Sequence, residues 1–420
     1  MTRTALAFAF LLSACRQQAD APYARELATA VPAIEKAVGL KFKTPPRVET
    51  RSKEEVRAFL ERKFDDDQPA LELAGAEKAY KLFGLLPDTL DLRRFMLRLL
   101  AEQVIGYYDP STKVLYVVSG GGTSKDAPSP EMVNITITHE LVHALQDQYL
   151  NLDSLARQHG DNDRQSAAQA VMEGQATFEQ LSIMLGGGNF AMNLPGGWDR
   201  VRETIRESQA SMPVFANAHM LGQETLLFPY LSGAEFIRRF KEKRPGQVPY
   251  AAMPIATTQV MHPELFLDSA FTPWRVELPK PENATLTYAN DLGEFETRLF
   301  LYQYLGNVGS AARGAAGWIG DRYEVVNTSR GAGIAWLTVW DTPLDAAEFR
   351  DLAEQTVEMR FGVAHGSGGV GVSRHFTGKG RQLELTATTI DGHAAVLYVD
   401  VPAGASTRIV DVARVQLRRE

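Results

Sequence analysis

The sequence predicts an α+β protein, with an α-rich N-terminal two-thirds and a mixed α+β C-terminal part. Helical spacing of apolar residues dominates from residue 23 to about residue 104, and it returns in several segments up to residue 243. In the last hundred residues, four strand-like runs surround one helical pattern. The 420 residues are enough for one large domain or two medium ones, each with its own core.

Two helices and a hairpin are predicted in the first 118 residues. The segment Ser52–Phe64 begins with a serine that can cap a helix, and its apolar residues fall on one face. Asp91–Val104 shows a similar apolar periodicity. Strand-like runs at 104–108 and 113–118 flank the turn signal Asp109-Pro110, so we expect a small β-hairpin there.

Two long helices are predicted in the middle of the chain, at about Glu131–Leu150 and Arg164–Leu185. A loop rich in Gly, Ser, Asp and Pro at 119–130 leads into the first of them. Three glycines at 186–188 end the second. Further helical patterns cover 199–210 and 223–243.

The C-terminal part of the sequence differs from the rest because strand-like patterns dominate in it. The Pro-rich, extended segment Trp274–Glu282 is a weak boundary signal, so we divide the mature chain into 23–282 and 283–420. For the segment Gly317–Tyr323 we expect a tight turn that holds the C-terminal part on the rest. The predicted strands are Tyr323–Asn327, Gly333–Trp340, Gln382–Thr389 and Ala394–Val401, and the predicted helix is Leu344–Phe361.

The N-terminus carries the marks of a secretory signal. Arg3 precedes an apolar run from Ala5 to Leu12, and small residues then lead to Cys15, the one cysteine in the sequence. The run is far shorter than the roughly 20 residues that a membrane-spanning helix needs. We therefore expect residues 1–14 to be a signal peptide that is not part of the fold.

The segment Leu12–Cys15 also resembles the lipobox of bacterial lipoproteins. That resemblance implies cleavage before Cys15 and acylation of this cysteine, with residues 15–22 as a tether to the membrane. Because Arg16 and not an aspartate follows, it further implies the outer membrane, facing the periplasm. The alternative is an ordinary signal peptide with a cysteine nearby.

Composition and charge exclude several classes of protein. With 45% hydrophobic and 23% charged residues, the chain is neither wholly disordered nor a multi-pass membrane protein. A single cysteine rules out an internal disulfide framework. The formal net charge of −7, with acidic and basic residues interleaved, argues against a nucleic-acid partner.

The motif His139-Glu140-Leu141-Val142-His143 lies inside a predicted helix. Residues four apart on a helix project from one face, one turn apart, which suits two imidazole ligands of a tetrahedral Zn²⁺. Glu140 stands beside them, where it could take a proton from a metal-bound water. Two partly exposed helix histidines are the alternative. The preceding hairpin supports the motif, because a substrate strand could bind along the edge of its sheet.

A third ligand is expected from the second long helix. Glu173 stands 30 residues after His143, and the positions three and four residues away from it are mostly small. Small neighbours would let this helix pack closely against the motif helix and bring the carboxylate to the metal, although an Ala-rich helix can also arise from propensity. Asp147, one turn after His143, is either a hydrogen-bond acceptor that orients a ligand imidazole or a solvated helix acid.

Together, His139, Glu140, His143 and the later Glu173 in an E-G-x-A context resemble the gluzincin branch of zinc metallopeptidases, the thermolysin-like group. The resemblance covers the two helices and the hairpin, about a hundred residues, and implies a zincin-like catalytic domain. It implies His139, His143 and Glu173 as ligands of one zinc ion, a water as the fourth ligand, and Glu140 as general base. The metzincin branch is disfavoured, because Tyr149 stands where its third histidine would be.

Gluzincins usually add a His or Tyr that donates to the oxyanion. Our first candidate is His262, in a short polar segment that resembles the Thr-x-Gln-x-x-His-Pro-Glu segment of uncharacterised bacterial metallopeptidase-like lipoproteins. A structural loop histidine is the alternative. Tyr230 is a weaker candidate.

These residues predict an envelope-anchored zinc peptidase that hydrolyses a peptide or protein substrate. The first rival is a non-catalytic envelope lipoprotein that keeps a structural zinc. Structural sites have four protein ligands, whereas this sequence offers three and a base, which favours an open site. The second rival is a zinc hydrolase of a non-peptide amide bond, which the motif does not separate from a peptidase.

Overall fold

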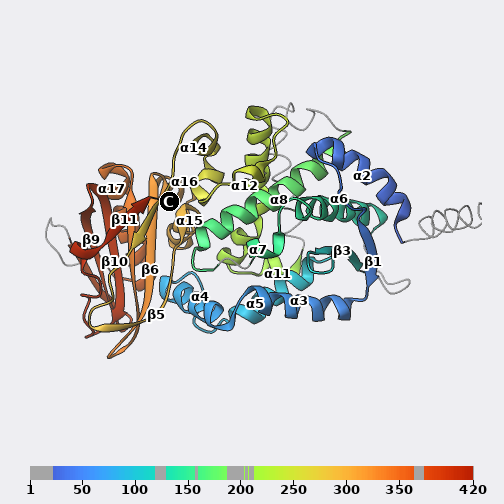
Figure 1. Ribbon diagram of the computed structural model, residues 1–420. Helices are drawn as coiled ribbons and strands as arrows, with labels where there is room; N and C mark the ends of the chain where they lie inside the picture. The colour runs from blue at the N-terminus through green and yellow to red at the C-terminus, as the bar shows by residue number, and fades with distance from the viewer. Residues whose placement is uncertain are drawn as a thin grey trace, which may run out of the picture.

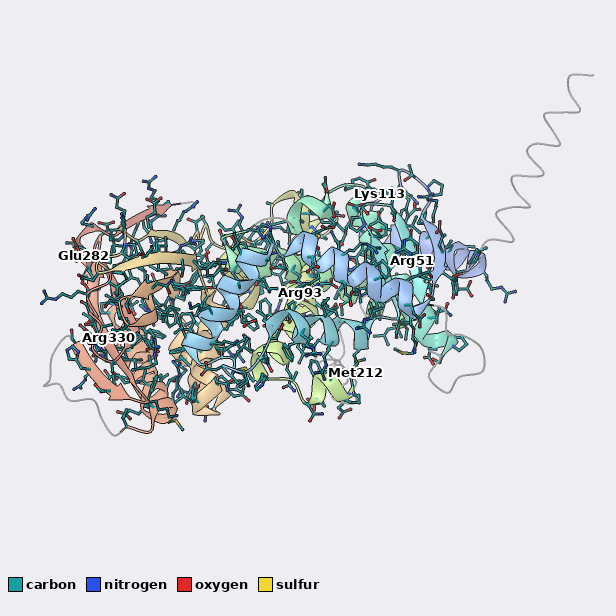
Figure 2. The ribbon with its side chains drawn as sticks, turned by 90° about the horizontal axis from the view of Figure 1, so that it is seen from below. Arg51, Arg93, Lys113, Met212, Glu282 and Arg330 are labelled. Carbon is teal, nitrogen blue, oxygen red and sulfur yellow. The ribbon has the colours of Figure 1, made fainter. Side chains whose placement is uncertain are left out.

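The computed structural model describes residues 22–118, 129–156, 159–186, 203, 207, 212–363 and 373–419. A helical part and a C-terminal sheet lie at opposite ends of an elongated molecule (Figure 1). In a view from below, Arg51 and Lys113 lie toward the helical end, and Glu282 and Arg330 toward the sheet end (Figure 2).

The elements of the helical part are α2 (Ala24–Val38), β1 (Arg47–Arg51), α3 (Lys53–Asp67), α4 (Ala70–Phe83), α5 (Leu92–Gln103), β2 (Gly106–Asp109), β3 (Val114–Val118), α6 (Pro130–Asp147), α7 (Leu152–Ala156), α8 (Asn162–Met184), α11 (Pro213–Ala216), α12 (Met220–Lys243), α13 (Thr257–Met261) and α14 (Pro263–Leu267). The elements of the C-terminal part are β4 (Trp274–Glu277), β5 (Ala284–Asn290), α15 (Gly293–Leu305), α16 (Val308–Ala315), β6 (Trp318–Thr328), β7 (Gly331–Trp340), α17 (Pro343–Phe361), β8 (Ser373–Gly378), β9 (Arg381–Ile390), β10 (His393–Pro402) and β11 (Gln416–Arg419). The predicted α+β class is confirmed.

The predicted helices of the helical part are confirmed where they are described. Ser52 caps α3 in a capping box, because its hydroxyl accepts from the Glu55 amide and the Glu55 carboxylate accepts from the Ser52 amide. The helices expected at 91–104, 131–150, 164–185 and 223–243 are α5, α6, α8 and α12. The helix expected at 199–210 and the loop at 119–130 fall almost wholly outside the described residues.

The predicted hairpin of β2 and β3 is also confirmed, but it belongs to a larger sheet. The strand order is β1-β3-β2, with β2 antiparallel and β1 parallel to β3. The helical spacing predicted from residue 23 to about residue 104 is wrong at residues 47–51, which form β1. Val48 is the one buried residue of β1, so these five residues carry too short an alternation to predict a strand. Pairing with the wholly buried β3 decides their conformation.

The C-terminal sheet has six antiparallel strands in the order β5-β6-β7-β10-β9-β8. The four predicted strands lie within β6, β7, β9 and β10, and the predicted helix is α17. Both faces are covered, because alternate residues such as Trp336 and Leu337 belong to separate hydrophobic clusters. The sequence did not predict β5, β8, α15 or α16. The extended segment 274–282 begins with β4, which pairs with β11.

Gly317 lies in a turn with a positive φ of 77°, and Trp318–Tyr323 forms the start of strand β6. The expectation of a tight turn over the whole segment Gly317–Tyr323 was therefore wrong. The segment has a structural role through its buried residue Asp321, whose carboxylate accepts four hydrogen bonds. The carboxylate accepts from the indole N–H groups of Trp318 and Trp336, at 3.0 and 2.8 Å. It also accepts from the backbone amides of Leu292 and Gly293, at 2.9 and 3.0 Å, and so caps the start of α15.

One hydrophobic core runs through the helical part and the C-terminal part. Phe83 of α4 meets the rings of Phe300, Tyr323 and Trp336 edge-on, at centroid distances of 5.9, 5.3 and 5.2 Å. The same cluster contains Phe236 and other residues of α8 and α12. Helices α8 and α12 therefore share a core with the C-terminal sheet, whereas α6, which carries the motif, packs with β3 in a separate cluster. The division at residue 282 stays a prediction.

Candidate metal centre

Helix α6 presents His139 and His143 on one face because its opposite face is buried. Ser129 caps the helix by accepting from the Met132 amide, and Pro130 occupies the first turn. Leu141, Val142 and Leu145 are fully buried with β3, and burial of each such side chain contributes about 1.5–3 kcal/mol. The apolar face thus fixes the rotation of α6 about its axis.

Helix α8 brings Glu173 beside α6 and is held there by α12. A Cβ on Gly174 would lie 2.2 Å from the backbone of Gly233, and a Cβ on Gly233 would lie 2.0 Å from the carbonyl oxygen of Ala170. Glycine at both positions therefore permits the close crossing of α8 and α12. The small residues around Glu173 were expected to face α6. In the structure, Ala170 and Gly174 face α12, whereas Ala176 packs with α6.

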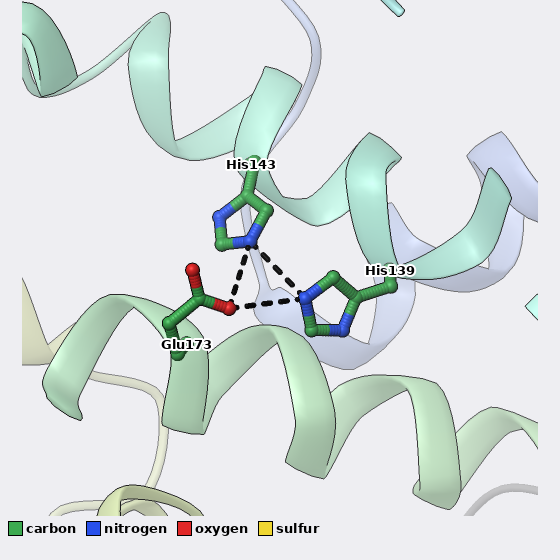
Figure 3. A group of neighbouring side chains, drawn as sticks. All are labelled: His139, His143 and Glu173. Carbon is green, nitrogen blue, oxygen red and sulfur yellow. Dashed lines mark hydrogen bonds and ion pairs between the residues drawn. The ribbon is translucent and has the colours of Figure 1, made fainter. Parts of the chain in front are cut away.

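The three predicted ligands converge (Figure 3). Glu173 Oε2 lies 3.2 Å from His139 Nε2 and 3.4 Å from His143 Nε2, and the two Nε2 atoms are 3.2 Å apart. A tetrahedral zinc with bonds of about 2.1 Å sets its ligand atoms about 3.4 Å apart. Within the described part of the chain, no other three His, Cys, Asp or Glu side chains bring ligand atoms within 4.8 Å of one another. The donor set and its spacing fit zinc.

The charges within the cluster of His139, His143 and Glu173 favour the presence of a cation there. The side chains of His139, His143 and Glu173 are only 13%, 12% and 21% exposed. Burial opposes ionisation of Glu173, but the two imidazoles outweigh it and hold the pKa of this carboxyl well below its usual value. Burial likewise opposes the charged form of His143, yet Glu173 raises the pKa of its imidazole to about 9. Three electron-pair donors thus share a site that stabilises a cation.

Glu140 is held by strand β2. The Tyr108 backbone amide donates to Glu140 Oε2 at 2.8 Å. Burial raises the pKa of Glu140, while the two histidines of the cluster act in the opposite direction. A carboxylate in a shielded position beside a metal centre is suited to proton transfer.

Asp147 does not orient a ligand imidazole, and that expectation was wrong. Its Oδ2 accepts from the Tyr108 hydroxyl at 2.7 Å and from Lys113 Nζ at 2.6 Å. The imidazoles instead donate to amide oxygens. His143 Nδ1 lies 2.9 Å from Gln146 Oε1, and His139 Nδ1 lies 3.1 Å from Gln180 Oε1.

His262 lies away from the cluster, so the structure does not support it as the oxyanion donor. Its Nε2 is 2.7 Å from Glu294 Oε1, a buried carboxylate at the start of α15. The hydrogen bond from His262 to Glu294 raises the pKa of the imidazole. This interaction ties the α13–α14 junction to the C-terminal part, and His262 is not among the residues that line the cavity at the cluster.

Tyr230, the weaker candidate for the oxyanion donor, lies beside the cluster. Its ring centroid is 6.1 Å from that of His139, and it lines the same cavity as Glu140. The charge of Glu173 and burial raise the pKa of Tyr230 well above the usual value. The phenol therefore keeps its proton, and its hydroxyl forms a hydrogen bond with Glu173.

The cluster opens into a cavity of about 720 Å³. Its wall includes Gly106, Tyr107 and Tyr108 of β2, an edge strand that pairs on one side with β3. Beyond the cluster and Glu140, the charged lining residues are Lys63 and Asp67, which form an ion pair. The apolar lining residues are Leu100, Val104, Ile105, Pro110, Met132, Ile135, Leu152, Leu155, Ala168, Met172, Leu181 and Met212.

The comparisons with known proteins match no part of the chain that contains this site. A family described as a domain of unknown function (DUF8575) matches residues 284–411, which hold the six-stranded sheet and helices α15, α16 and α17. No curated protein and no solved structure matches the chain. The matched region contains none of His139, His143 and Glu173, so the centre must be interpreted from its own geometry.

Sequence reasoning missed the hydrogen bonds of Tyr108, Gln146 and Gln180. The signal for Gln146 was present, because it lies three residues after His143 and so on a neighbouring part of the helix surface. Cys15 and the rest of residues 1–21 fall outside the described structure. None of the described helices combines the length and apolar character needed to cross a bilayer.

Proposed function

We propose that this chain is a zinc-dependent peptidase of gluzincin type. The observation that carries the proposal is the convergence of His139, His143 and Glu173 within 3.2–3.4 Å, with Glu140 on the same cavity. The set has three protein ligands and a neighbouring carboxylate base. Catalytic zinc sites have this composition, whereas structural sites have four protein ligands.

Each side chain of the site has a role in this proposal. Zinc held by the three ligands supplies a water of near-neutral pKa and polarises the scissile carbonyl. Glu140 accepts the proton of the attacking water and returns it to the leaving amine. Because Oε2 of Glu140 accepts from the Tyr108 amide, the other carboxylate oxygen takes the proton. Tyr230 donates its hydroxyl proton in a hydrogen bond to the carbonyl oxygen as that oxygen gains negative charge.

The substrate is best accommodated as an extended peptide beside β2. Among the described residues β2 pairs only with β3, and its other edge lines the cavity, where the Tyr108 amide donates to Glu140. An added strand could form backbone hydrogen bonds along the rest of that edge. The mainly apolar lining then receives the substrate side chains. A non-peptide amide would make no use of a strand edge, which favours the peptidase over that rival.

The test combines metal analysis with hydrolysis. Zinc is quantified by plasma mass spectrometry in the wild-type chain, in Glu173→Ala and in Glu140→Gln, and each is assayed on a library of quenched fluorescent peptides. We expect one zinc per wild-type chain, loss of zinc in Glu173→Ala, and retained zinc without hydrolysis in Glu140→Gln. A wild-type chain that binds no zinc when it is offered the metal, or a Glu140→Gln variant as active as wild type, contradicts the proposal.

We further infer that Cys15 anchors the protein in the cell envelope, most simply in the outer membrane facing the periplasm. Several acyl chains on one residue anchor firmly, since each buried CH₂ contributes about 0.8 kcal/mol. Expression with labelled palmitate in a two-membrane bacterium tests this. We expect label in the wild-type chain and none in Cys15→Ser, and label in both chains or in neither contradicts the anchor.

A further inference from the structure

Gln146 occupies the junction between α6 and α8 and is completely buried. All its polar atoms are engaged. Its Nε2 donates to the Met172 carbonyl oxygen at 3.0 Å and to Gln175 Oε1 at 2.9 Å. Its Oε1 lies 2.9 Å from His143 Nδ1. The side chain of Gln146 thus links His143, an expected ligand, to Met172, the residue before the expected ligand Glu173.

These contacts determine which nitrogen of His143 carries the proton. A backbone carbonyl can only accept, so the amide NH₂ of Gln146 must face Met172. The amide oxygen then faces His143, and Nδ1 must be the nitrogen that donates to it. A neutral imidazole with its proton on Nδ1 has its lone pair on Nε2, the atom 3.4 Å from Glu173 Oε2.

We propose that Gln146 is a positioning residue that holds His143 in the tautomer able to bind zinc through Nε2, and that Gln180 does the same for His139. The inference rests on the proposed zinc site and not on hydrolysis. Gln180 Oε1 lies 3.1 Å from His139 Nδ1, and among the described residues the amide nitrogen of Gln180 makes only a long contact of 3.9 Å with Met184 Sδ. Gln146 on α6 is thus held by two further hydrogen bonds, whereas Gln180 on α8 is held by one weak sulfur contact.

The neutral amides of Gln146 and Gln180 should give a lower metal affinity than carboxylates would give in the same positions. An acceptor on the outer nitrogen of a ligand imidazole fixes the ring and raises its basicity, and a carboxylate does so more strongly than an amide. Here the only formal negative charge among the three ligands and their two amide partners is that of Glu173. The substitution Gln180→Glu keeps an acceptor oxygen for His139 and loses only the weak contact with the Met184 sulfur. The variant should therefore bind zinc more tightly than wild type.

The experiment measures zinc affinity of the purified full-length chain by competition with a chromophoric chelator. Removing either acceptor, in Gln146→Leu or Gln180→Leu, should weaken zinc binding about 10-fold to 100-fold. Gln180→Glu should strengthen it. Gln169 provides the matched control, because it lines the same cavity but makes no hydrogen bond to His139 or His143 in the described structure. Gln169→Leu should stay within about twofold of wild type, and Gln169→Glu should strengthen binding less than Gln180→Glu.

Two further measurements separate positioning from folding. Urea unfolding of the metal-free variants checks that Gln146→Leu remains folded, and if it does not, the half-buried Gln180 variants decide the question. Nitrogen-15 spectra of histidine-labelled, zinc-loaded wild-type chain report the tautomer directly, with Nδ1 protonated in both His139 and His143. Mutation of each histidine in turn assigns the signals.

The outcomes distinguish this inference from the proposed function. Unchanged zinc affinity in the Gln180 variants, equal effects in the Gln169 controls, or a zinc bond through Nδ1 overturns the inference while leaving the zinc site in place. A wild-type chain without affinity for zinc overturns both. Weakened binding in the Leu variants with strengthened binding in Gln180→Glu supports the inference.

Discussion

The backbone amide of Tyr108 donates a 2.8 Å hydrogen bond to Oε2 of Glu140. Strand β2 therefore orients the proposed general base on α6. The side chain of Tyr108 is anchored as well, because its hydroxyl donates to the buried Asp147 carboxylate on the same helix. Lys113, from the turn between β2 and β3, completes this anchor through its ion pair with Asp147. The edge strand and the motif helix thus hold each other in register at the point where proton transfer is proposed.

Removal of this anchor should slow hydrolysis without loss of zinc. In Asp147→Asn the ion pair with Lys113 is lost, and β2 can shift relative to Glu140. A displacement of about 1 Å at a reacting group can cost up to about 100-fold in rate, so we expect kcat to fall by between about 10-fold and 100-fold. Steady-state kinetics with a peptide substrate and zinc analysis provide the check. Tyr108→Phe, which removes one hydroxyl, should show a smaller loss in the same direction, and an unchanged kcat in both variants would rule out the anchor.

Tyr230→Phe should impair the transition state more than substrate binding. The variant keeps the ring but removes the hydroxyl donor, and loss of one oxyanion donor costs about 100-fold to 1,000-fold in kcat. Zinc content should remain at one per chain. His262→Ala is the control, because His262 contacts Glu294 outside the cavity and its loss should leave kcat unchanged. If the His262 variant loses activity and the Tyr230 variant does not, the assignment is reversed.

Glu296 should make stability depend on pH. It is buried at the junction of α15 and α4, where Tyr80 donates to Oε1 at 2.9 Å and Oε2 is without a hydrogen-bond partner in the described structure. Burial raises its pKa from 4.5 to about 7, against the hydrogen bonds of Tyr80 and Asn162 and with the added repulsion of Asp321. Because the folded state binds this proton more tightly, the free energy of unfolding falls as pH rises from about 4.5 to 7.

The variant Glu296→Gln isolates this effect. Relative to wild type it should gain stability across the same pH window, by at most about 3 kcal/mol for a shift of this size. Denaturant unfolding of both proteins at pH 4.5 and pH 8 measures the difference. Titrating groups that do not interact with Glu296 are common to both chains and cancel in the comparison. An equal difference at the two pH values would mean that folding does not raise the pKa of Glu296.

The crossing of α8 and α12 should be sensitive to a single methyl group. In Gly233→Ala the added Cβ would meet the Ala170 carbonyl oxygen at 2.0 Å, so one of the two helices must move. We expect a loss of about 1–3 kcal/mol in the free energy of unfolding and weaker zinc binding, because Glu173 lies on α8. Gly309→Ala on α16 is the control, since its Cβ would meet no atom closer than 3.5 Å. That variant should be neutral or gain about 0.5 kcal/mol.

Zinc should stabilise the folded chain through the cluster. A metal that binds only the folded state at 100 times its Kd adds about 2.7 kcal/mol to the free energy of unfolding. Thermal unfolding of metal-free wild type should therefore shift upward when zinc is added and return when a chelator removes it. Glu173→Ala should show little shift. An equal shift in both proteins would place the stabilising zinc elsewhere.

The elements predicted from sequence were those with a long or regular pattern. Helices α3, α5, α6, α8 and α12 have several turns of apolar periodicity, and their ends carry residues that cap or break a helix. Strand β1 is only five residues long with one buried position, so local pattern carried too little information. The four predicted strands of the C-terminal sheet have long apolar runs, whereas β5 and β8 are edge strands with few buried residues.

In the site too, the sequence predicted the features that depend on local spacing and did not predict the contacts between distant segments. The i,i+4 spacing of His139 and His143 places both on one face of any helix, so the sequence alone determined that pair. Asp147 was misassigned because each four-residue step advances about 40° around a helix. Two steps after His139 it faces β2 and accepts from Tyr108, while Gln146 faces α8 and Met172.

What the sequence determined by itself was therefore a helix bearing two imidazoles and a carboxylate, a second helix bearing Glu173, and the α+β class. Periodicity and capping are local, and they act wherever the helix lies. Which side chain meets which was decided by tertiary packing. Gly174 and Gly233 set the position of α8, and the partners found for Tyr230 and His262 lie on other elements. Contacts between residues far apart in the chain depend on how helices and sheets pack, which no local spacing encodes.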